Sequence, residues 1–382
     1  MNLRYLTAGE SHGPALVGIL EGLPAGLALD AAYLQGELIR RKRGHGRGNR
    51  QKIEADRVEI LSGVRHGKTL GSPLGLLIVN QDFKNWEHIM AVAPDAAGDK
   101  RRVSVPRPGH ADLVGALKYG FEDMRNVLER SSARETTMRV ALASAARRFL
   151  EECGVSVASR VVSIGGVFDA SAWTAKVSSL NARADASAVR CTDAKSSAAM
   201  VAAIDAAKAE GDTLGGVFEV YAGPLPVGLG SYVQWDRRLE APLTAALMSL
   251  NAIKGVEVGL GFRSARLPGS QVHDELWPRG RKVAYKSNRS GGIDGGMTTG
   301  QTLVLRAAMK PLATLMKPLA SVDRRTGKAA KAHIERSDAC AVPSAAVIGE
   351  SLAALVLADA VLAKFGGDSM REILPRLRSW KP

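Results

Sequence analysis

The chain has few cysteines and few aromatic residues, and each shortage argues against a class of protein. Its three cysteines, Cys153, Cys191 and Cys340, are far apart, and no CxxC pair occurs, which argues against a disulfide framework and a zinc ribbon. The seven histidines include no HExxH motif, so the signature of a zinc protease is missing. Aromatic residues make up 5% of the chain, which is little for a protein that stacks on the bases of single-stranded nucleic acid.

A hydrophobic run of membrane-spanning length is also missing. The longest candidate, LAALVLADAVLA at residues 352–363, is interrupted by Asp359, and it predicts a buried helix instead. The N-terminal stretch MNLRYLTAGESHG contains no signal-peptide core. We therefore expect a cytoplasmic protein.

Positive charge is abundant. The 382 residues carry a net charge of +14, and 46% of them are hydrophobic, which indicates a globular protein with an anionic partner. One run contains seven bases and no acid: Arg40, Arg41, Lys42, Arg43, Arg47, Arg50 and Lys52. A solvated helix face and a nucleic-acid surface are both possible readings of it. Its three glycines instead favour a loop that approaches a ligand closely, with arginines that hold phosphate or carboxylate.

Periodicity predicts helices and strands interleaved along one chain. Strands are expected at 3–8, 15–22, 22–30, 58–63, 74–80, 215–223 and 256–262, and again after the glycine-rich loop that begins at 287. Helices are expected at 31–43, capped by Asp30 with Leu34, Leu38 and Ile39 on one face, and at 197–211, 239–255 and 342–365. Few clean βαβ units are present, so the fold class is α+β rather than Rossmann.

The strongest helix signal runs from 130 to 153. Ser132 and Glu135 match a capping box there, which makes Ser132 the expected N-cap. Residues 168–213 are rich in alanine and serine, and we interpret them as a peripheral excursion within a single domain of residues 1–382.

Three motifs resemble catalytic signatures without the context that these require. SGVRHGKT (62–69) ends like a Walker A loop, but Ser62 replaces the first glycine and a hairpin turn is the better interpretation. GHGRGN (44–49) follows a helix, whereas a dinucleotide turn follows a strand. Gly9-Glu10-Ser11-His12-Gly13 satisfies G-x-S-x-G, but the next segment reads as a strand and not as the helix of a nucleophile elbow.

Eight segments, taken together and in order, resemble chorismate synthase. They are GESHG (9–13), RRKRGHGRG (40–48), RPGHAD (107–112), RSSARET (130–136), MSLNAIKGVEVG (248–259), GSQVHDE (269–275), SNRSGGIDGGMTTG (287–300) and RSDAC (336–340). They span most of the chain, and residues 168–213 are the main part without a matching motif.

The resemblance implies a reaction, a cofactor and an architecture. The reaction is the 1,4-anti elimination of phosphate from 5-enolpyruvylshikimate 3-phosphate to chorismate, in the shikimate pathway of aromatic amino acid biosynthesis. It implies a lyase that needs reduced FMN without net redox change, with NADPH as a candidate reductant. It also implies a β-α-β sandwich of antiparallel sheets with helices packed around them, assembled as a homotetramer. An anionic substrate and cofactor agree with the arginine-rich composition, and titratable His12 and His110 agree with acid–base chemistry.

The resemblance also implies site residues. His12 would protonate or hydrogen-bond the reduced flavin, His110 would assist phosphate departure, and Asp338 would help to take up a proton through flavin N5. Ser11 and Ser132 would support these groups by hydrogen bonds. Substrate or NADP binding is expected at Arg41, Arg47, Arg107 and Arg134. FMN binding is expected at Arg130, Ser131, Ser132, Asn251, Ala252, Gly295, Lys310, Pro311, Leu312, Ala313, Thr314 and Arg336.

Two segments depart from the family pattern. Leu312-Ala313-Thr314 stands where many members have more hydroxyl groups, and Ser337 and Ala339 stand where many have His and Pro. The sequence shows no separate reductase domain, which favours a monofunctional enzyme. A basic nucleic-acid-binding protein and a serine hydrolase are the alternatives.

Overall fold

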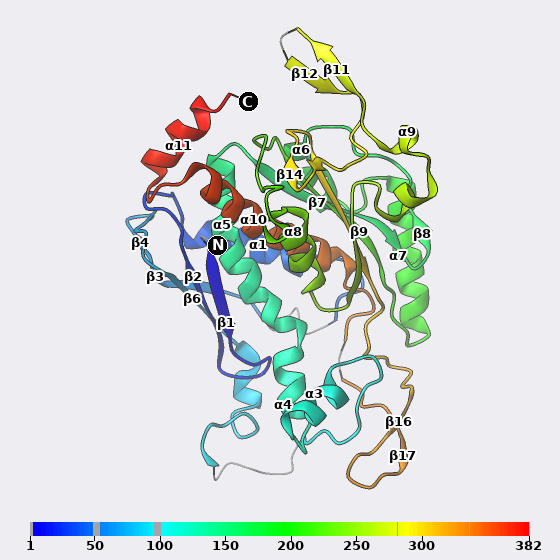
Figure 1. Ribbon diagram of the computed structural model, residues 1–382. Helices are drawn as coiled ribbons and strands as arrows, with labels where there is room; N and C mark the ends of the chain where they lie inside the picture. The colour runs from blue at the N-terminus through cyan, green and yellow to red at the C-terminus, as the bar shows by residue number, and fades with distance from the viewer. Residues whose placement is uncertain (1–2, 49–53, 95–100, 281, 336, 382) are drawn as a thin grey trace.

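Two antiparallel sheets form the frame of the molecule (Figure 1). The computed structural model describes residues 3–48, 54–94, 101–280, 282–335 and 337–381. The first sheet has the order β1-β2-β6-β3 and consists of β1 (Arg4–Ala8), β2 (Ala15–Glu21), β3 (Val58–Ser62) and β6 (Leu74–Val79). The second has the order β10-β15-β9-β7-β8 and consists of β7 (Ser156–Ile164), β8 (Val167–Phe168), β9 (Gly216–Gly223), β10 (Ile253–Val258) and β15 (Leu303–Met309). The predicted α+β class with antiparallel sheets is confirmed.

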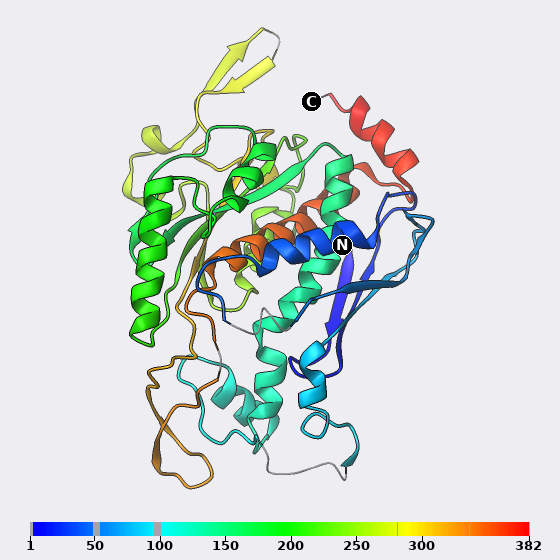
Figure 2. The same ribbon diagram turned by 180° about the vertical axis from the view of Figure 1, so that it is seen from behind.

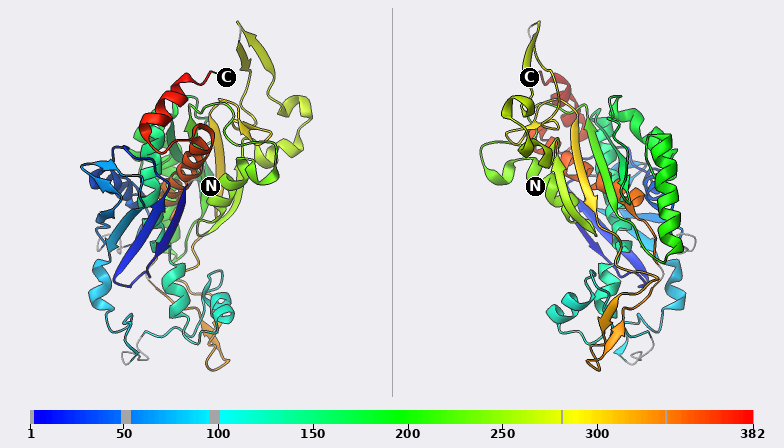
Figure 3. Two further views of the ribbon diagram at one scale, coloured as in Figure 1. Left: turned by 60° about the vertical axis from the view of Figure 1, so that its left-hand side comes forward. Right: turned by 90° about the vertical axis from the view of Figure 1, so that its right-hand side faces the viewer.

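Three helices fill the space between the sheets: α1 (Ala31–Lys42), α5 (Thr136–Glu152) and α10 (Val342–Phe365). Helix α5 packs on β2 and β6, helix α10 packs on β7 and β9, and α1 contacts both helices. Figure 3 shows the sheets on opposite sides of this layer. Helix α6 (Val177–Asp185) packs on β7 and β9, and α7 (Ala194–Ala209) packs on β7 and β8, at the edge of the second sheet away from β10.

Helix α10 is the centre of the core. By length and composition it is the one helix among the described residues that could cross a membrane, but 83% of its apolar window is buried inside the protein. It is apolar all round because it packs against a sheet and other helices at once. The expectation of a buried helix at residues 352–363 is confirmed.

Smaller elements complete the chain. They are β4 (Val64–Arg65), β5 (Lys68–Thr69), η1 (Gln81–Asn85), α3 (Asp112–Tyr119), α4 (Arg125–Ser131), η3 (Ala133–Glu135), η4 (Trp235–Arg237), α8 (Glu240–Met248), η5 (Gly261–Arg266), α9 (Gly269–Val272), β11 (Leu276–Arg279), β12 (Lys282–Tyr285), β13 (Ile293–Asp294), β14 (Met297–Thr298), β16 (Ala320–Val322), β17 (Ala329–Lys331) and α11 (Met370–Ser379). Elements α3, α4, β16 and β17 gather at one end of the molecule, and the hairpin β11–β12 projects from the other (Figures 1 and 2).

Several sequence predictions are confirmed locally. Asp30 caps α1 by accepting a hydrogen bond from the Tyr33 amide at 2.8 Å. The Walker-like segment forms the hairpin β4–β5, and the segment after Ser11 forms strand β2. Neither motif therefore has the strand–turn–helix context of a P-loop or of a nucleophile elbow.

Other local predictions are wrong. Residues 22–30 form only isolated bridges at Ala25 and Ala28 rather than a strand. The expected helix 130–153 is interrupted at Ser132, whose extended backbone ends α4 and whose hydroxyl caps a 3-10 turn before α5. The helix expected at 239–255 ends at Met248, because Ile253 begins an edge strand. Ile39 is 46% exposed, although Leu34 and Leu38 are buried.

Residues 168–213 contribute to the hydrophobic core and to the cavity as well as to the protein surface. Their helix α7 places Met200 and Ile204 in the main hydrophobic core. Lys208, Gly211, Asp212 and Thr213, at the end of this segment, line the large cavity described below. The segment therefore connects the β7–β8 edge of the second sheet to that cavity.

Candidate functional site

One large cavity lies where the helical layer meets the α3–α4 end of the molecule. Its volume of about 800 Å³ is near the upper end of the range for small-molecule sites. Described segments from along the whole chain contribute to its lining, at positions 11–12, 41–48, 54, 107–111, 128–136, 208–213, 250–254, 309–316, 335 and 337–348. Because the lining residues are far from one another in sequence, the site forms only when the chain folds.

Most of the predicted site residues line this cavity. They are Ser11, His12, Arg41, Arg47, Arg107, His110, Ser131, Ser132, Arg134, Asn251, Ala252, Lys310, Leu312, Ala313, Thr314 and Asp338. Three others do not. The Arg130 guanidinium binds the carbonyls of Thr7 and Gly9, Gly295 forms the turn of the hairpin β13–β14, and Pro311 is absent from the lining. Arg336, Arg50 and Lys52 lie outside the described residues.

His12 is held by a buried carboxylate and an aromatic ring. Its Nδ1 lies 2.9 Å from Oε1 of Glu129, and its backbone amide donates to the same carboxylate at 2.8 Å. The Trp86 ring stacks on the imidazole with 3.8 Å between ring centroids. The neighbouring Ser11 hydroxyl donates to the Ser132 hydroxyl at 3.0 Å, so Ser11 supports the start of α5 rather than forming a nucleophile–base pair.

His110 and Arg107 share the carboxylate of Asp112. His110 Nδ1 lies 2.6 Å from Asp112 Oδ1, and Arg107 Nε donates to Oδ2 at 2.8 Å. Burial alone would raise the pKa of Asp112, but hydrogen bonds from His110 and Arg107 outweigh it and hold that pKa well below its ordinary value. Arg107 also donates to the Thr314 hydroxyl at 2.7 Å, which ties the 107–112 turn to the 310–314 segment.

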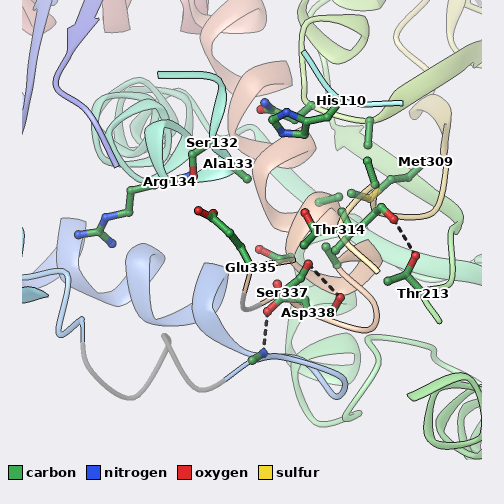
Figure 4. Close-up of a pocket in the computed structure, with 18 of the residues that line it drawn as sticks. His110, Ser132, Ala133, Arg134, Thr213, Met309, Thr314, Glu335, Ser337 and Asp338 are labelled. Atoms are coloured by element: carbon green, nitrogen blue, oxygen red, sulfur yellow. Dashed lines mark hydrogen bonds between the residues drawn. The ribbon is translucent and has the colours of Figure 1, made fainter. Parts of the chain in front are cut away.

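Asp338 is fixed by the glycine-rich loop after α1. It accepts a hydrogen bond from the Gly48 amide at 2.6 Å and pairs with Arg47 at 2.8 Å. Figure 4 shows Asp338 beside Glu335 and Ser337 on one segment of the wall. Gly46 allows the approach: its φ is +85°, and a Cβ there would lie 2.8 Å from Ile204 and 3.2 Å from the Cys340 amide nitrogen. The described part of this glycine-rich loop is therefore closely packed, and its Gly46, Arg47 and Gly48 line the cavity.

Arg41 and Arg134 surround the start of helix α5. Arg41 donates to the Thr136 hydroxyl at 2.8 Å, and burial lowers its pKa to about 10 against the opposing effect of Asp56. Arg134 donates to Asn80 at 2.8 Å and pairs with Asp56 and Glu54. In Figure 4 its side chain extends away from the other labelled residues. The guanidinium groups of Arg41, Arg47, Arg107 and Arg134 therefore have protein partners, and an incoming anion would share or exchange them.

The donor set of the cavity fits an anionic cofactor with a polar ring system. Within the described part of the chain, the lining includes seven Lys or Arg residues against four Asp or Glu residues. Ser131 Oγ, Asn251 Oδ1 and Arg47 Nε, all from lining residues, are buried without a hydrogen-bond partner among the described residues, and buried polar atoms usually have one. Ser132, Ala133, Arg134 and Thr136, around the start of α5, also line the cavity.

Sequence reasoning missed several residues in or beside the cavity. Glu129 and Trp86 hold His12 but lie in no recognisable motif, and Glu335 lines the cavity. Lys208 and Lys254 also line the cavity, and no ion pair to either occurs in the part of the chain that the structure describes. For Lys254 a signal existed, because it lies inside the matching segment 248–259. For the others, only the fold brings them to the site.

Comparisons with known proteins agree over nearly the whole chain. The family model described as chorismate synthase matches residues 3–362. A chorismate synthase of Desulforamulus reducens is 54% identical over 99% of this chain and 98% of its own, and one of Desulforudis audaxviator is 57% identical over 99% and 97%. A crystal structure of chorismate synthase superposes with a TM-score of 0.80 at 42% identity and covers 99% of this chain and 97% of its own. The chain therefore belongs to the chorismate synthase family.

Proposed function

We propose that the large cavity is the active site at which this enzyme, a carbon–oxygen lyase of the shikimate pathway, makes chorismate. The substrate is 5-enolpyruvylshikimate 3-phosphate, and the reaction is a 1,4-anti elimination that releases phosphate. One observation carries the assignment of the site: His12, His110 and Asp338, from three distant motifs, line a single cation-rich cavity. Phosphate elimination needs such a combination of proton-handling groups and fixed positive charge.

Substrate binding is assigned to the cationic wall. Arg41, Arg47, Arg107 and Arg134 hold the phosphate and the two carboxylates, with Lys208 and Lys254 as additional cations. Each of the four arginines has a protein partner in this structure. Because these guanidinium groups are already oriented, less conformational entropy is lost when the anion binds.

The cavity also fits reduced FMN. The residues that would hold it are Ser131, Ser132, Asn251, Ala252, Lys310, Leu312, Ala313 and Thr314. Unpartnered Ser131 and Asn251 oxygens support this assignment. When bound, reduced FMN supplies electron density to the substrate as phosphate departs and recovers it when the proton is lost. The family motifs also imply FMN contacts at Arg130, Gly295, Pro311 and Arg336, but the first three do not line this cavity and Arg336 lies outside the described residues.

The titratable residues take separate roles. His110, oriented through Nδ1 by Asp112, assists the departing phosphate oxygen. His12 holds a proton at the opposite part of the site, and Asp338 accepts one from the reacting centre. Ser11 and Ser132 keep these groups in place through their mutual hydrogen bond.

The wider assignments follow the family. We infer a single domain over residues 1–382, a homotetramer and a cytoplasmic location. NADPH is a candidate reductant of the flavin, and an external reductase is the alternative. Nucleic acid and membrane are not partners in this proposal.

An anaerobic assay tests the proposal. Purified enzyme, reduced FMN and 5-enolpyruvylshikimate 3-phosphate should yield chorismate and one equivalent of phosphate, with a transient change in the flavin spectrum. His12→Ala and Asp338→Ala should retain FMN binding and lose about 10²- to 10⁴-fold in kcat. His66→Asn, an exposed histidine of the β4–β5 turn, is the matched control. Salt-dependent DNA binding without phosphate release would favour the basic nucleic-acid-binding alternative instead.

A further inference from the structure

Glu129 is a buried carboxylate that the proposed function does not use. It lies in α4, is 2% exposed, and accepts both the backbone amide and the ring Nδ1 of His12. Its own backbone carbonyl accepts the Ser11 amide at 2.9 Å. Helix α4 thus holds the 11–12 turn through three hydrogen bonds that converge on one residue. The Glu129 side chain is 1% exposed, and burying a carboxylate costs free energy unless paired charges and hydrogen bonds compensate for it.

Trp86 restrains the face of the same imidazole. Its ring is 9% exposed and stacks on His12 with an interplanar angle of 22°. Trp86 is itself fixed, because its Nε1 donates to Asp82 at 3.2 Å and the Arg101 guanidinium lies 4.0 Å from its centroid. The His12 ring is therefore restrained both at its Nδ1 edge and across its plane.

This arrangement leaves one ring nitrogen for the cavity. Among the described residues, His12 makes its ring hydrogen bonds through Nδ1, and none to Nε2 is found. A carboxylate is an acceptor only, so Nδ1 must carry a hydrogen. The neutral imidazole is then the Nδ1–H tautomer with the Nε2 lone pair available, and the protonated ring offers Nε2–H.

We propose that Glu129 is the positioning residue that fixes the tautomer of His12, so that Nε2 is the atom that exchanges a proton with the occupant of the cavity. This proposal rests on the role given to His12 in the proposed function. When the imidazolium gives up its Nε2 proton, that N–H bond breaks, the ring becomes the neutral Nδ1–H form, and its charge falls from +1 to 0.

Arg125 lies between Glu129 and Glu335, a carboxylate of the cavity lining. Its Nη1 lies 3.4 Å from Glu129 and 2.7 Å from Glu335, and Glu335 lies 3.3 Å from Nε2 of His333. Burial raises the pKa of Glu335, but hydrogen bonds from His333 and Arg125 outweigh this and lower that pKa to about 2. Arg125 therefore faces two carboxylates and places positive charge beside Glu129.

The test measures the tautomer directly in the enzyme without cofactor. Long-range proton–nitrogen NMR on nitrogen-labelled protein, above the titration range of histidine, should show His12 with hydrogen on Nδ1. Glu129→Gln removes the charge and can either accept or donate, so it should give a mixture of tautomers. Its kcat should fall by at least about tenfold, while the KM for substrate stays within about threefold of the wild-type value. Glu129→Asp, which keeps the carboxylate, should restore part of the Nδ1–H population.

Glu122→Gln is the matched control, because Glu122 pairs with Arg102 but its side chain is 87% exposed. It should leave the tautomer and the kcat unchanged. The proposal is overturned if wild-type His12 is the Nε2–H tautomer, a result that does not depend on any variant folding. It is also overturned if Glu129→Gln folds and keeps both the wild-type tautomer and the wild-type kcat. A fully active His12→Ala would instead remove the catalytic role of His12 and leave the tautomer measurement intact.

Discussion

At the scale of single residues, carboxylates hold the basic groups of the site. Glu129 holds His12, Asp112 holds His110 and Arg107, and Asp338 holds Arg47. Glu129 and Asp112 are buried, whereas Asp338 is partly exposed. The chemistry therefore depends on carboxylates whose first task is to orient a cation or an imidazole.

The Asp112 carboxylate gives this idea a stability test. Asp112 is fully buried, and its pKa in the folded protein lies well below the ordinary value. A depressed pKa means that the carboxylate stabilises the fold above the unfolded pKa near 4, and that this contribution is lost as the pH falls further. Asp112→Asn should reduce the free energy of unfolding by about 2–3 kcal/mol at pH 7. In urea titrations that deficit should shrink below about pH 4, whereas the exposed control Asp236→Asn should show no such trend.

The sequence selected three candidate proton-handling residues that the structure brings to one cavity, but it did not select Glu129. Motif spacing was enough to select His12, His110 and Asp338, because each stands in a glycine-rich or turn segment that matches the family. Glu129 lies 117 positions from His12 in the sequence, and the residues around it have the pattern of an ordinary amphipathic helix. Only the packing of α4 against the 11–12 turn makes it a partner, and periodicity carries no information about such a contact.

At the scale of elements, the contact between α10 and the second sheet depends on a glycine. A Cβ at Gly349 would lie 2.6 Å from Phe218 Cε2 and 3.1 Å from Leu247, and Phe218 is fully buried. Gly349→Ala should therefore lower the free energy of unfolding by about 1–2 kcal/mol, because overpacking exceeds the gain in helix propensity. Gly36→Ala is the matched control in α1, where nothing lies within 4 Å; it should raise stability by about 0.5–1 kcal/mol. The melting temperatures of both variants, measured by thermal unfolding, test this prediction. Equal shifts of the same sign would contradict the packing argument.

The elements that sequence reasoning missed are those whose pattern is set by tertiary contacts. Strand β7 is buried along almost its whole length, so it shows no alternation, and its buried Arg160 and Ser159 resemble a loop composition. Arg160 is tolerated there because Glu219 on β9 pairs with it at 2.9 Å. The break at Ser132 is equally hidden, since the same serine that matches a helix cap also receives the Ser11 hydroxyl.

At the scale of the whole molecule, one buried ionic cluster joins distant parts of the chain. Glu350 in α10 is fully buried and binds Arg40 of α1 at 2.9 Å and Arg147 of α5. Ser159 of β7 and Asn181 of α6 donate to the same carboxylate at 2.9 and 2.8 Å. The helical layer and the second sheet therefore share one charge, which favours unfolding as a single unit, as expected for one domain.

Replacing that charge tests the unity of the fold. Glu350→Gln leaves buried arginines without part of their counter-charge, so the free energy of unfolding should fall by about 3–5 kcal/mol. Because the cluster joins elements from both halves of the chain, far-ultraviolet circular dichroism and tryptophan fluorescence should shift together to the same lower denaturant midpoint. Glu210→Gln, an exposed residue at the end of α7, should leave both midpoints in place. Two separate transitions, with only one displaced by Glu350→Gln, would show that the chain folds as more than one cooperative unit.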